Sequence, residues 1–164
     1  MQRYLAKPLI KKTAVIDLEI GREYSNVDIM LLFKCSGQGG MRRSKETRTL
    51  VLVKDKASIY EDTWQNGICY YTGMGQEGDQ HFYERQNKTL FNLPFIDVEA
   101  YLFESYKIGN KNTYKFCGKV VLAEKPYYDR QADICHHDRQ VCIFPLRIKQ
   151  SDADVGYVPE YGLL

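Results

Sequence analysis

Short runs of β-branched, aromatic and leucine residues recur along the chain, each closed by glycine, asparagine or charged residues. This pattern is typical of strands separated by turns, and it constrains the fold more than any other feature. Because no run is long and few segments have helical spacing, we expect an α+β protein built on a twisted sheet or partly closed β-barrel with a few short helices. The strands are predicted at Arg48–Val53, Ile68–Thr72, Val98–Phe103, Tyr114–Leu122 and Val141–Ile148. Pro145 indicates an edge or a bulge in the last strand.

Two segments carry helix signals. Ser25 and Asp28 have the spacing of a capping box, which predicts a short helix over Ile29–Phe33, although the apolar run could also be a buried strand. A second helix is predicted from Asp79 or Gln80 to Leu90. With 164 residues the chain is expected to form one domain. We divide it into residues 1–20, an arm and first strand closed by Gly21; residues 21–150, the domain; and residues 151–164, a tail.

The segment Tyr60–Leu90 combines flat side chains, carboxylates and glycines. Tyr60 and Asp62 lie in an acidic-aromatic stretch, and a glycine-rich loop follows the strand that ends at Thr72. Aromatic faces can stack on a planar ring, and a carboxylate can accept hydrogen bonds from its edge. Glycines let the backbone approach a ligand closely. The segment therefore predicts a pocket for a planar polar ring.

Motifs in this segment resemble the SET- and RING-associated (SRA, or YDG) domain. They are Tyr60-Glu61-Asp62, Tyr71-Thr72-Gly73 followed by Gly75, Asp79-Gln80, and Asn87 with Leu90; Gly39-Gly40, Arg43-Ser44 and Leu50–Leu52 upstream also look like the family. Members of this family bind DNA that carries modified cytosine and flip the base out of the duplex. The resemblance implies an SRA/PUA-like barrel. The short loop after Gly73 is similar to bacterial members, which are often fused to an HNH nuclease in modification-dependent restriction enzymes.

The resemblance also implies a role for matching residues. Tyr71 and Tyr60 would stack on the two faces of the flipped base, and Asp62 would accept hydrogen bonds from the cytosine edge. Thr72 and Gly73 would complete the lining of this pocket. The structural alternative is that strand alternation sends either Tyr70 or Tyr71 to the core, and that Asp62 only caps a turn. Asp79, Gln80 and Asn87 are expected to organise the loop and the helix start.

Local charge, rather than the formal net charge of +2, indicates where DNA would bind. Between Lys34 and Lys54 basic residues are opposed only by Glu46, although a solvated basic loop is an equally good interpretation. Either the 36–43 loop or one of Met74, Gln76 and Glu77 would fill the space that the flipped base leaves. We expect contacts to the DNA backbone or grooves from Gln38, Gly39, Gly40, Arg42, Arg43, Lys45, Arg48, Met74 and Gln76.

Other features narrow the class of protein. Five cysteines without paired spacing, no signal peptide and no apolar run of bilayer length predict a cytoplasmic protein without membrane contact. The resemblance implies that this cytoplasm is bacterial. Cys135, His136, His137 and Cys142 do not have the spacing of a zinc site, so we expect no metal and no cofactor. The favoured function is non-catalytic recognition of double-stranded DNA containing 5-methylcytosine or 5-hydroxymethylcytosine, with cleavage by a fused or separate nuclease. The alternatives are a small nuclease acting on modified DNA, a PUA-like RNA-binding module and a structural interaction domain.

Overall fold

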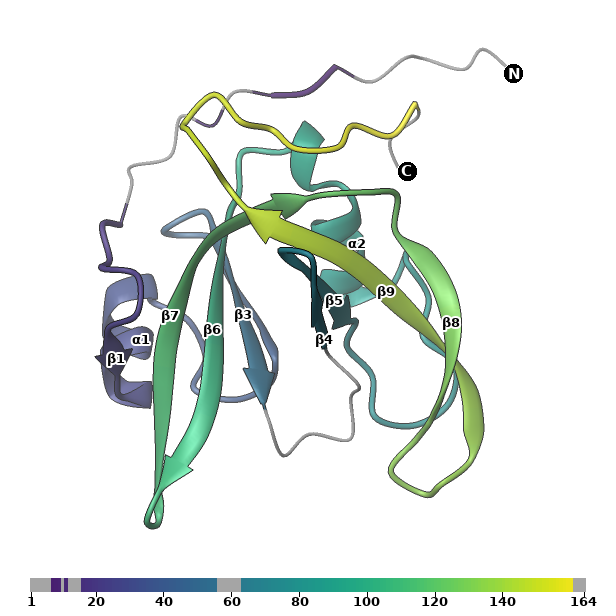
Figure 1. Cartoon of the computed structure of the whole chain (residues 1–164), viewed down its shortest axis with the longest axis horizontal. Coiled ribbons are helices and arrows are strands. Elements are labelled where there is room, and N and C mark those ends of the chain that lie inside the picture. Colours follow the sequence, from purple (N-terminus) through teal and green to yellow (C-terminus); the bar gives the residue numbers. More distant parts are fainter. Residues whose placement is uncertain (1–6, 10, 12–15, 56–62, 161–164) are drawn as a thin grey trace.

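The computed structural model describes residues 7–9, 11, 16–55 and 63–160 (Figure 1). Within these ranges short helices accompany a large sheet. The helices are α1 (Asn26–Phe33), α2 (Arg85–Phe91) and the 3₁₀ turn η1 (Leu93–Phe95). The strands are β1 (Glu23–Tyr24), β2 (Met41–Ser44), β3 (Thr49–Asp55), β4 (Thr63–Gln65), β5 (Ile68–Thr72), β6 (Glu99–Ile108), β7 (Lys111–Leu122), β8 (Tyr127–Ala132) and β9 (Asp138–Ile148).

The strands of the described residues form one sheet in the order β2-β3-β6-β7-β9-β5-β4, with β1 added to β7 and β8 added to β9. β3 and β6 run parallel, and the other pairs are antiparallel. The sheet curls strongly, so that β9 crosses in front of α2 while β3 and β6 lie beside α1 (Figure 1). This architecture confirms the predicted α+β class with a twisted, partly closed sheet.

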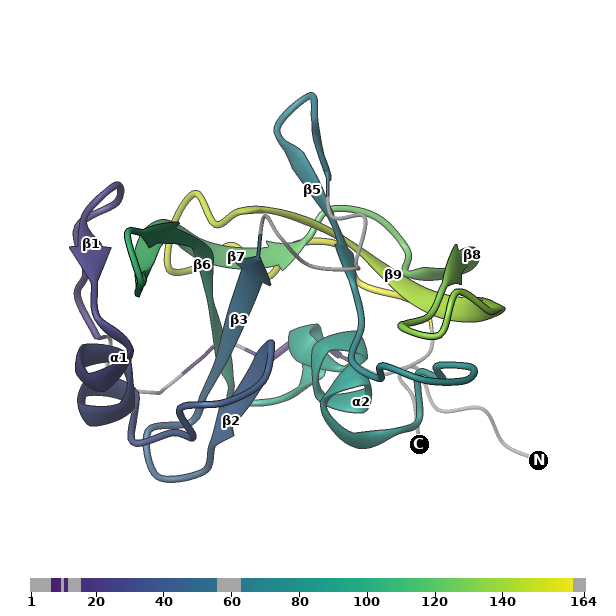
Figure 2. The same ribbon diagram turned by 90° about the horizontal axis from the view of Figure 1, so that it is seen from below.

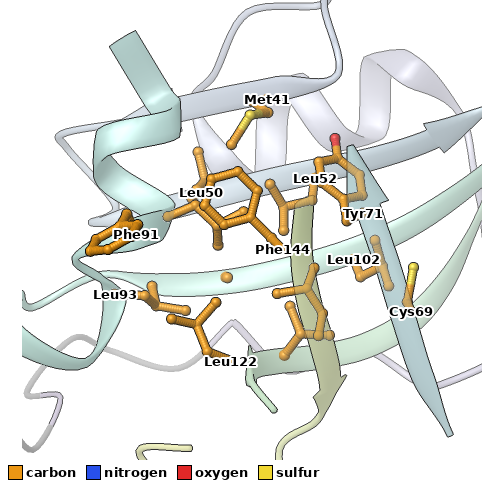
Figure 3. Packing of buried hydrophobic residues seen from close by; sticks show 14 of the residues in the cluster. Met41, Leu50, Leu52, Cys69, Tyr71, Phe91, Leu93, Leu102, Leu122 and Phe144 are labelled. Carbon is orange, nitrogen blue, oxygen red and sulfur yellow. The ribbon is translucent and has the colours of Figure 1, made fainter. Parts of the chain in front are cut away.

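Both faces of β3 and β6 are buried, which explains the continuous apolar run Leu50–Val53. Leu50 and Leu52 belong to a core cluster with Leu90 and Phe91 of α2 (Figure 3). Val51 faces the other way, into a second cluster with Ile29 and Phe33 of α1. Strand alternation thus sends neighbouring residues into two separate cores. A helix covers each core.

The capping box at α1 is confirmed. The Ser25 hydroxyl accepts a hydrogen bond from the Asp28 amide at 3.0 Å, and the Ser25 amide donates to the Asp28 carboxylate at 3.1 Å. The helix begins at Asn26, three residues before the predicted start, and ends at Phe33 as predicted. Ile29 and Phe33, one turn apart, are its buried residues.

The second predicted helix is wrong at its start, because α2 begins at Arg85 rather than at Asp79 or Gln80. Asp79 and Gln80 are instead bound to β9. The Gln140 amide donates to the Asp79 carboxylate at 2.8 Å, and the Gln80 amide donates to the Gln140 carbonyl at 2.9 Å. These bonds to a distant strand replace the hydrogen bonds that a helix would need.

The N-terminal and C-terminal strands also differ from the expectation. Among the described residues, 16–20 are not part of a strand and the first strand is β1, whereas residues 12–15 of the predicted arm and strand lie outside the described ranges. Pro145 lies inside the sheet, at the point where the neighbour of β9 changes from β8 (paired with 138–143) to β7 (paired with 146–148). Its carbonyl accepts from the Ala123 amide at 2.8 Å, so its nitrogen, which has no hydrogen, also faces this junction. The proline therefore leaves no ladder donor unpaired.

Residues after β9 fold back on the sheet. Arg147 binds Asp154 through two hydrogen bonds of 2.6 and 2.9 Å, and the Tyr157 amide donates to the Leu122 carbonyl at 2.7 Å. Hydrogen bonding to the Arg147 guanidinium is the main reason that the pKa of Asp154 lies well below its usual range. The tail up to Tyr157 is thus attached to the domain.

Candidate nucleic-acid interface

Two loops meet beside the end of β3. The glycine loop (residues 36–40) joins α1 to β2, and the finger loop (residues 73–79) joins β5 to the α2 region. The Tyr71 hydroxyl donates to the Gly40 carbonyl at 2.8 Å and lies 3.2 Å from the Val53 carbonyl. The Val53 amide also donates to the Gly40 carbonyl, at 2.7 Å. Tyr71 therefore fixes the glycine loop to the end of β3.

The structure describes three of the five residues predicted to hold the flipped base; Tyr60 and Asp62 lie outside the described residues. Tyr71 belongs to the core cluster around Leu52 and is 2% exposed (Figure 3). Thr72 points to the opposite face of β5, where its hydroxyl accepts from the Gln131 side-chain amide at 3.0 Å. Gly73 packs so closely that an added Cβ would lie 2.6 Å from the Asn87 side-chain oxygen.

Buried side chains hold the finger loop through hydrogen bonds to its backbone. The Asn87 amide accepts from the Met74 amide at 2.8 Å and donates to the Met74 carbonyl at 3.1 Å. The Gln80 amide nitrogen donates to the carbonyls of Gly73 at 2.8 Å and Gly75 at 3.0 Å, and its oxygen accepts from the Cys142 amide at 3.0 Å. The prediction that Gln80 and Asn87 organise the loop is confirmed.

Arg139 of β9 is a further support that the sequence analysis missed. It is 2% exposed and donates from Nη1 to the carbonyls of Gly75 at 2.6 Å and Gly78 at 3.1 Å. Within the described part of the chain, its buried Nε and Nη2 atoms have no hydrogen-bond partner. Arg139 therefore joins β9 to the finger loop.

Two hollows border these loops. The larger loop hollow, about 520 Å³, is lined by both loops and by Glu84 and Arg85. The smaller loop hollow, about 360 Å³, lies between the glycine loop and the β6–β7 pair, where it includes Asp55, Asn112 and Tyr114. Gly39, Gly40 and Gln76 line both. The predicted contact residues that border at least one of the two hollows are Gln38, Gly39, Gly40, Arg42, Met74 and Gln76.

The basic residues predicted to contact DNA are divided between two places. Arg42 is 4% exposed, donates to the Gly39 carbonyl at 2.9 Å and to the Asn26 side chain at 2.6 Å, and thereby stabilises the glycine loop. Lys45 and Arg48 lie in the β2–β3 turn, at the opposite end of the hairpin from Gly40. Arg48 is paired with Asp97 at 2.8 Å. Arg43 donates to the Ser44 and Thr49 carbonyls at the same end.

The cysteine and histidine residues near β9 lie in two different environments. Cys135, His136 and His137 lie between β8 and β9, in a turn in which His136 has φ of 62°. Cys142 is fully buried in the core. Within the described residues no group of three or more His, Cys, Asp or Glu side chains could hold a metal ion. No helix in the described part of the chain is long and apolar enough to span a membrane.

Known structures share this fold. The chain aligns with the sulfur binding domain and SRA domain of ScoMcrA, solved with phosphorothioated DNA, at a TM-score of 0.66 and 16% identity, covering 88% of this chain and 44% of that one. It aligns with the SUVH5 SRA domain, solved with methylated CHH DNA, at a TM-score of 0.60 and 21% identity, covering 88% of this chain and 98% of that one. It aligns with the DNA modification-dependent restriction endonuclease AspBHI at a TM-score of 0.58 and 16% identity, covering 80% of this chain and 42% of that one.

A search of curated protein sequences found no match to the chain. The model of the family described as "ScoMcrA-like, SRA domain" matches residues 20–157. This range runs from just before β1 to the residue whose amide binds the Leu122 carbonyl, and so includes the whole sheet and both loops of the candidate interface. The chain therefore belongs to the family of ScoMcrA-like SRA domains.

Proposed function

We propose that this domain recognises 5-methylcytosine or 5-hydroxymethylcytosine in double-stranded DNA by flipping the base into a pocket. The observation that carries the proposal is the meeting of the glycine loop and the finger loop over two hollows that share Gly39, Gly40 and Gln76. Family membership supports it. So do structures with the same fold that were solved with methylated and phosphorothioated DNA.

The proposed pocket consists of Tyr60, Asp62, Tyr71, Gly73 and the backbone of Thr72, because the Thr72 side chain points to the opposite face of β5. Flipping costs a few kcal/mol of unstacking and unpairing. Stacking returns roughly 1–3 kcal/mol per base, and a bidentate edge contact adds roughly 1–3 kcal/mol of discrimination. Because Tyr71 is almost fully buried, a base that stacks on its ring must displace part of what covers it. Its hydroxyl bonds to Gly40 and Val53 keep the ring in place during that exchange.

The DNA would lie across the two loops. Gln76 borders both hollows and belongs to a loop whose backbone is held by buried side chains. We therefore assign it the role of filling the space that the flipped base leaves. Backbone amides of the glycine loop would contact phosphate, with Gln38 and Met74 beside them. Arg43, Lys45 and Arg48 could reach only DNA that extends along the β2–β3 hairpin to its far end.

The biological setting that we propose is a modification-dependent restriction system in a bacterial cytoplasm. The relatives of that kind are longer: the chain spans 44% of the ScoMcrA fragment and 42% of AspBHI. A nuclease, either fused or separate, would cut the DNA, and this domain would supply specificity without catalysis of its own.

Binding of fluorescent duplexes that differ only in one central cytosine tests the proposal. Fluorescence anisotropy should give tighter binding to the 5-methylcytosine or 5-hydroxymethylcytosine duplex than to the plain duplex. A duplex with 2-aminopurine next to the modified base should brighten on binding, because flipping unstacks the neighbour. Equal affinities for all three duplexes, or stronger binding to RNA, would refute it. Cleavage of modified DNA with Mg²⁺ would favour the nuclease alternative.

The variant Asp62→Ala tests whether the pocket lies where we propose. The variant should lose the preference for modified duplexes and keep the salt-dependent binding to plain DNA, because that binding depends on phosphate contacts. Asp152→Ala is the matched control, since the side chain of Asp152 is 91% exposed and lies in the tail. If Asp62→Ala binds all duplexes as the wild type does, the pocket has been misplaced.

A further inference from the structure

A separate hollow of about 430 Å³ lies on the face of β5 opposite Tyr71. We call it the outer hollow. In Figure 2 the β4–β5 hairpin projects from the body of the molecule, and β8 lies to its right. The volume falls within the roughly 300–1,000 Å³ of small-ligand sites. The outer hollow is lined by Gln65, Tyr70, Tyr127, Asp129, Gln131 and Ile143, with Arg130 beside them.

Strand geometry brings these side chains together. Tyr127, Asp129 and Gln131 alternate along β8 and therefore share one face. Tyr70 shares a face of β5 with Thr72, two residues on. The curl of the sheet lets Gln131 reach across β9 to the Thr72 hydroxyl, 3.0 Å away. This bond closes one side of the outer hollow and joins β8 to β5.

The lining has the chemistry of a nucleobase site. Two phenol rings provide flat apolar faces, and Tyr127 is still 40% exposed. Asp129 is an acceptor for an exocyclic amine, as carboxylates are for cytosine. The Gln65 amide can both donate and accept. Burial, followed by the nearby Asp129 and Tyr70, raises the pKa of Tyr127, which is consistent with both groups lying close to its phenol.

We propose that the outer hollow binds one unpaired nucleobase that carries an exocyclic amine, stacked on Tyr70 and Tyr127 and read by Asp129. This site is independent of the flipped-base pocket, because Tyr70 and Tyr71 face opposite sides of β5. We assign the base to single-stranded DNA, because there its faces and its amine edge are free of a pairing partner. The Arg130 guanidinium lies at the rim and is bound to Asp138 at 2.5 Å, so this ion pair adds no net charge beside the site.

Anisotropy with short labelled single strands tests the site. Oligo(dC) should bind more tightly than oligo(dT), since thymine has no exocyclic amine. Competition with dCMP distinguishes a free nucleotide from a strand: dCMP should compete only weakly if backbone contacts contribute. Chemical-shift mapping with oligo(dC) should show the largest changes at Tyr70, Tyr127 and Gln131.

Variants separate stacking from edge recognition. Tyr127→Ala should weaken oligo(dC) binding at least fivefold, and Tyr127→Phe should bind nearly as the wild type does, because stacking needs the ring and not the hydroxyl. Asp129→Asn should reduce the preference for oligo(dC) over oligo(dT). Tyr83→Ala is the matched control: Tyr83 is 63% exposed and stacks on His81, away from the outer hollow.

The proposals for the outer hollow and for the flipped-base pocket can be refuted independently of each other. Tyr127→Ala should leave the preference for modified duplexes unchanged, whereas Asp62→Ala should leave oligo(dC) binding unchanged. Chemical shifts that move in the finger loop instead of β8, or equal oligo(dC) binding by Tyr127→Ala and the wild type, would overturn the inference. Loss of modified-duplex preference in Tyr127→Ala would show that the outer hollow is not a separate site.

Discussion

The side-chain amide of Asn87 pairs with both backbone groups of Met74, accepting from its N–H and donating to its carbonyl. Met74 is the second residue of the finger loop, and Asn87 is fully buried in α2. The Asn87 side chain thus makes the two backbone hydrogen bonds with Met74 that a neighbouring strand would otherwise make. Together with Gln80, which binds the Gly73 carbonyl, Asn87 determines where the finger loop leaves β5.

Replacing Asn87 with alanine should lower the free energy of unfolding by about 1–3 kcal/mol, because the Met74 amide and carbonyl lose a buried partner. It should also weaken binding to modified DNA, since the finger loop would be less ordered. Urea denaturation and anisotropy measure the two effects. Lys88→Ala, at an exposed position of the same helix, is the control. Unchanged stability in Asn87→Ala would contradict this role of the amide.

Arg139→Met should loosen the finger loop without unfolding the domain. The change removes the bonds to Gly75 and Gly78 but also removes the cost of burying a charge, so stability should change by no more than about 1 kcal/mol. Hydrogen exchange of residues 75–78 should become at least tenfold faster. Arg43→Met, which also loses two carbonyl contacts but far from this loop, should leave that exchange rate unaltered.

Gly156→Ala tests the attachment of the tail. Gly156 has φ of +69°, and an added Cβ would lie 2.5 Å from the Leu122 carbonyl oxygen and 2.7 Å from the Val121 Cβ. Strain and overpacking together should destabilise the domain by roughly 2–4 kcal/mol. Gly109→Ala has a similar φ of +62° but no atom within 4 Å of the added Cβ, so it reports strain alone. Equal melting temperatures for the two variants would show that the tail moves away from Leu122 and Val121 without a loss of stability.

The lowered pKa of Asp154 should make the free energy of unfolding depend on pH. Arg147 holds the pKa of Asp154 in the folded protein below the value of about 3.9 typical of unfolded chains. The stabilisation is therefore complete above about pH 4 and is lost as the pH falls through the folded pKa. Asp154→Asn should cost about 1–3 kcal/mol at pH 7, and the difference from the wild type should shrink below about pH 4. Urea denaturation at several pH values measures this, with Asp152→Asn as the exposed control.

Local signals in the sequence were sufficient for several elements. The capping box of Ser25 and Asp28 fixed the start of α1 to within a few residues, and the run Ile68–Thr72 became β5 with the predicted bounds. Each depends on contacts between residues close in sequence or on a clear apolar pattern. The motifs of the finger loop also indicated correctly that Gln80 and Asn87 are structural.

Long-range contacts explain what the sequence did not predict. Arg139 lies 64 residues from Gly75 along the chain, so no local pattern links it to the finger loop. The strand β8 was missed because nearly all of its residues are exposed and give no alternation of polar and apolar positions. The clustering of Tyr70 with Tyr127 likewise requires the curl of the sheet at β9.

The parallel pairing of β3 with β6 has a consequence for how such a domain diversifies. Seven residue pairs, from Thr49 with Glu99 to Asp55 with Ser105, fix where the intervening chain departs and returns. No residue of the finger loop takes part in these pairs. Evolution or a protein engineer can therefore exchange that loop for one of another length, as in grafting, while the scaffold that carries it keeps its alignment.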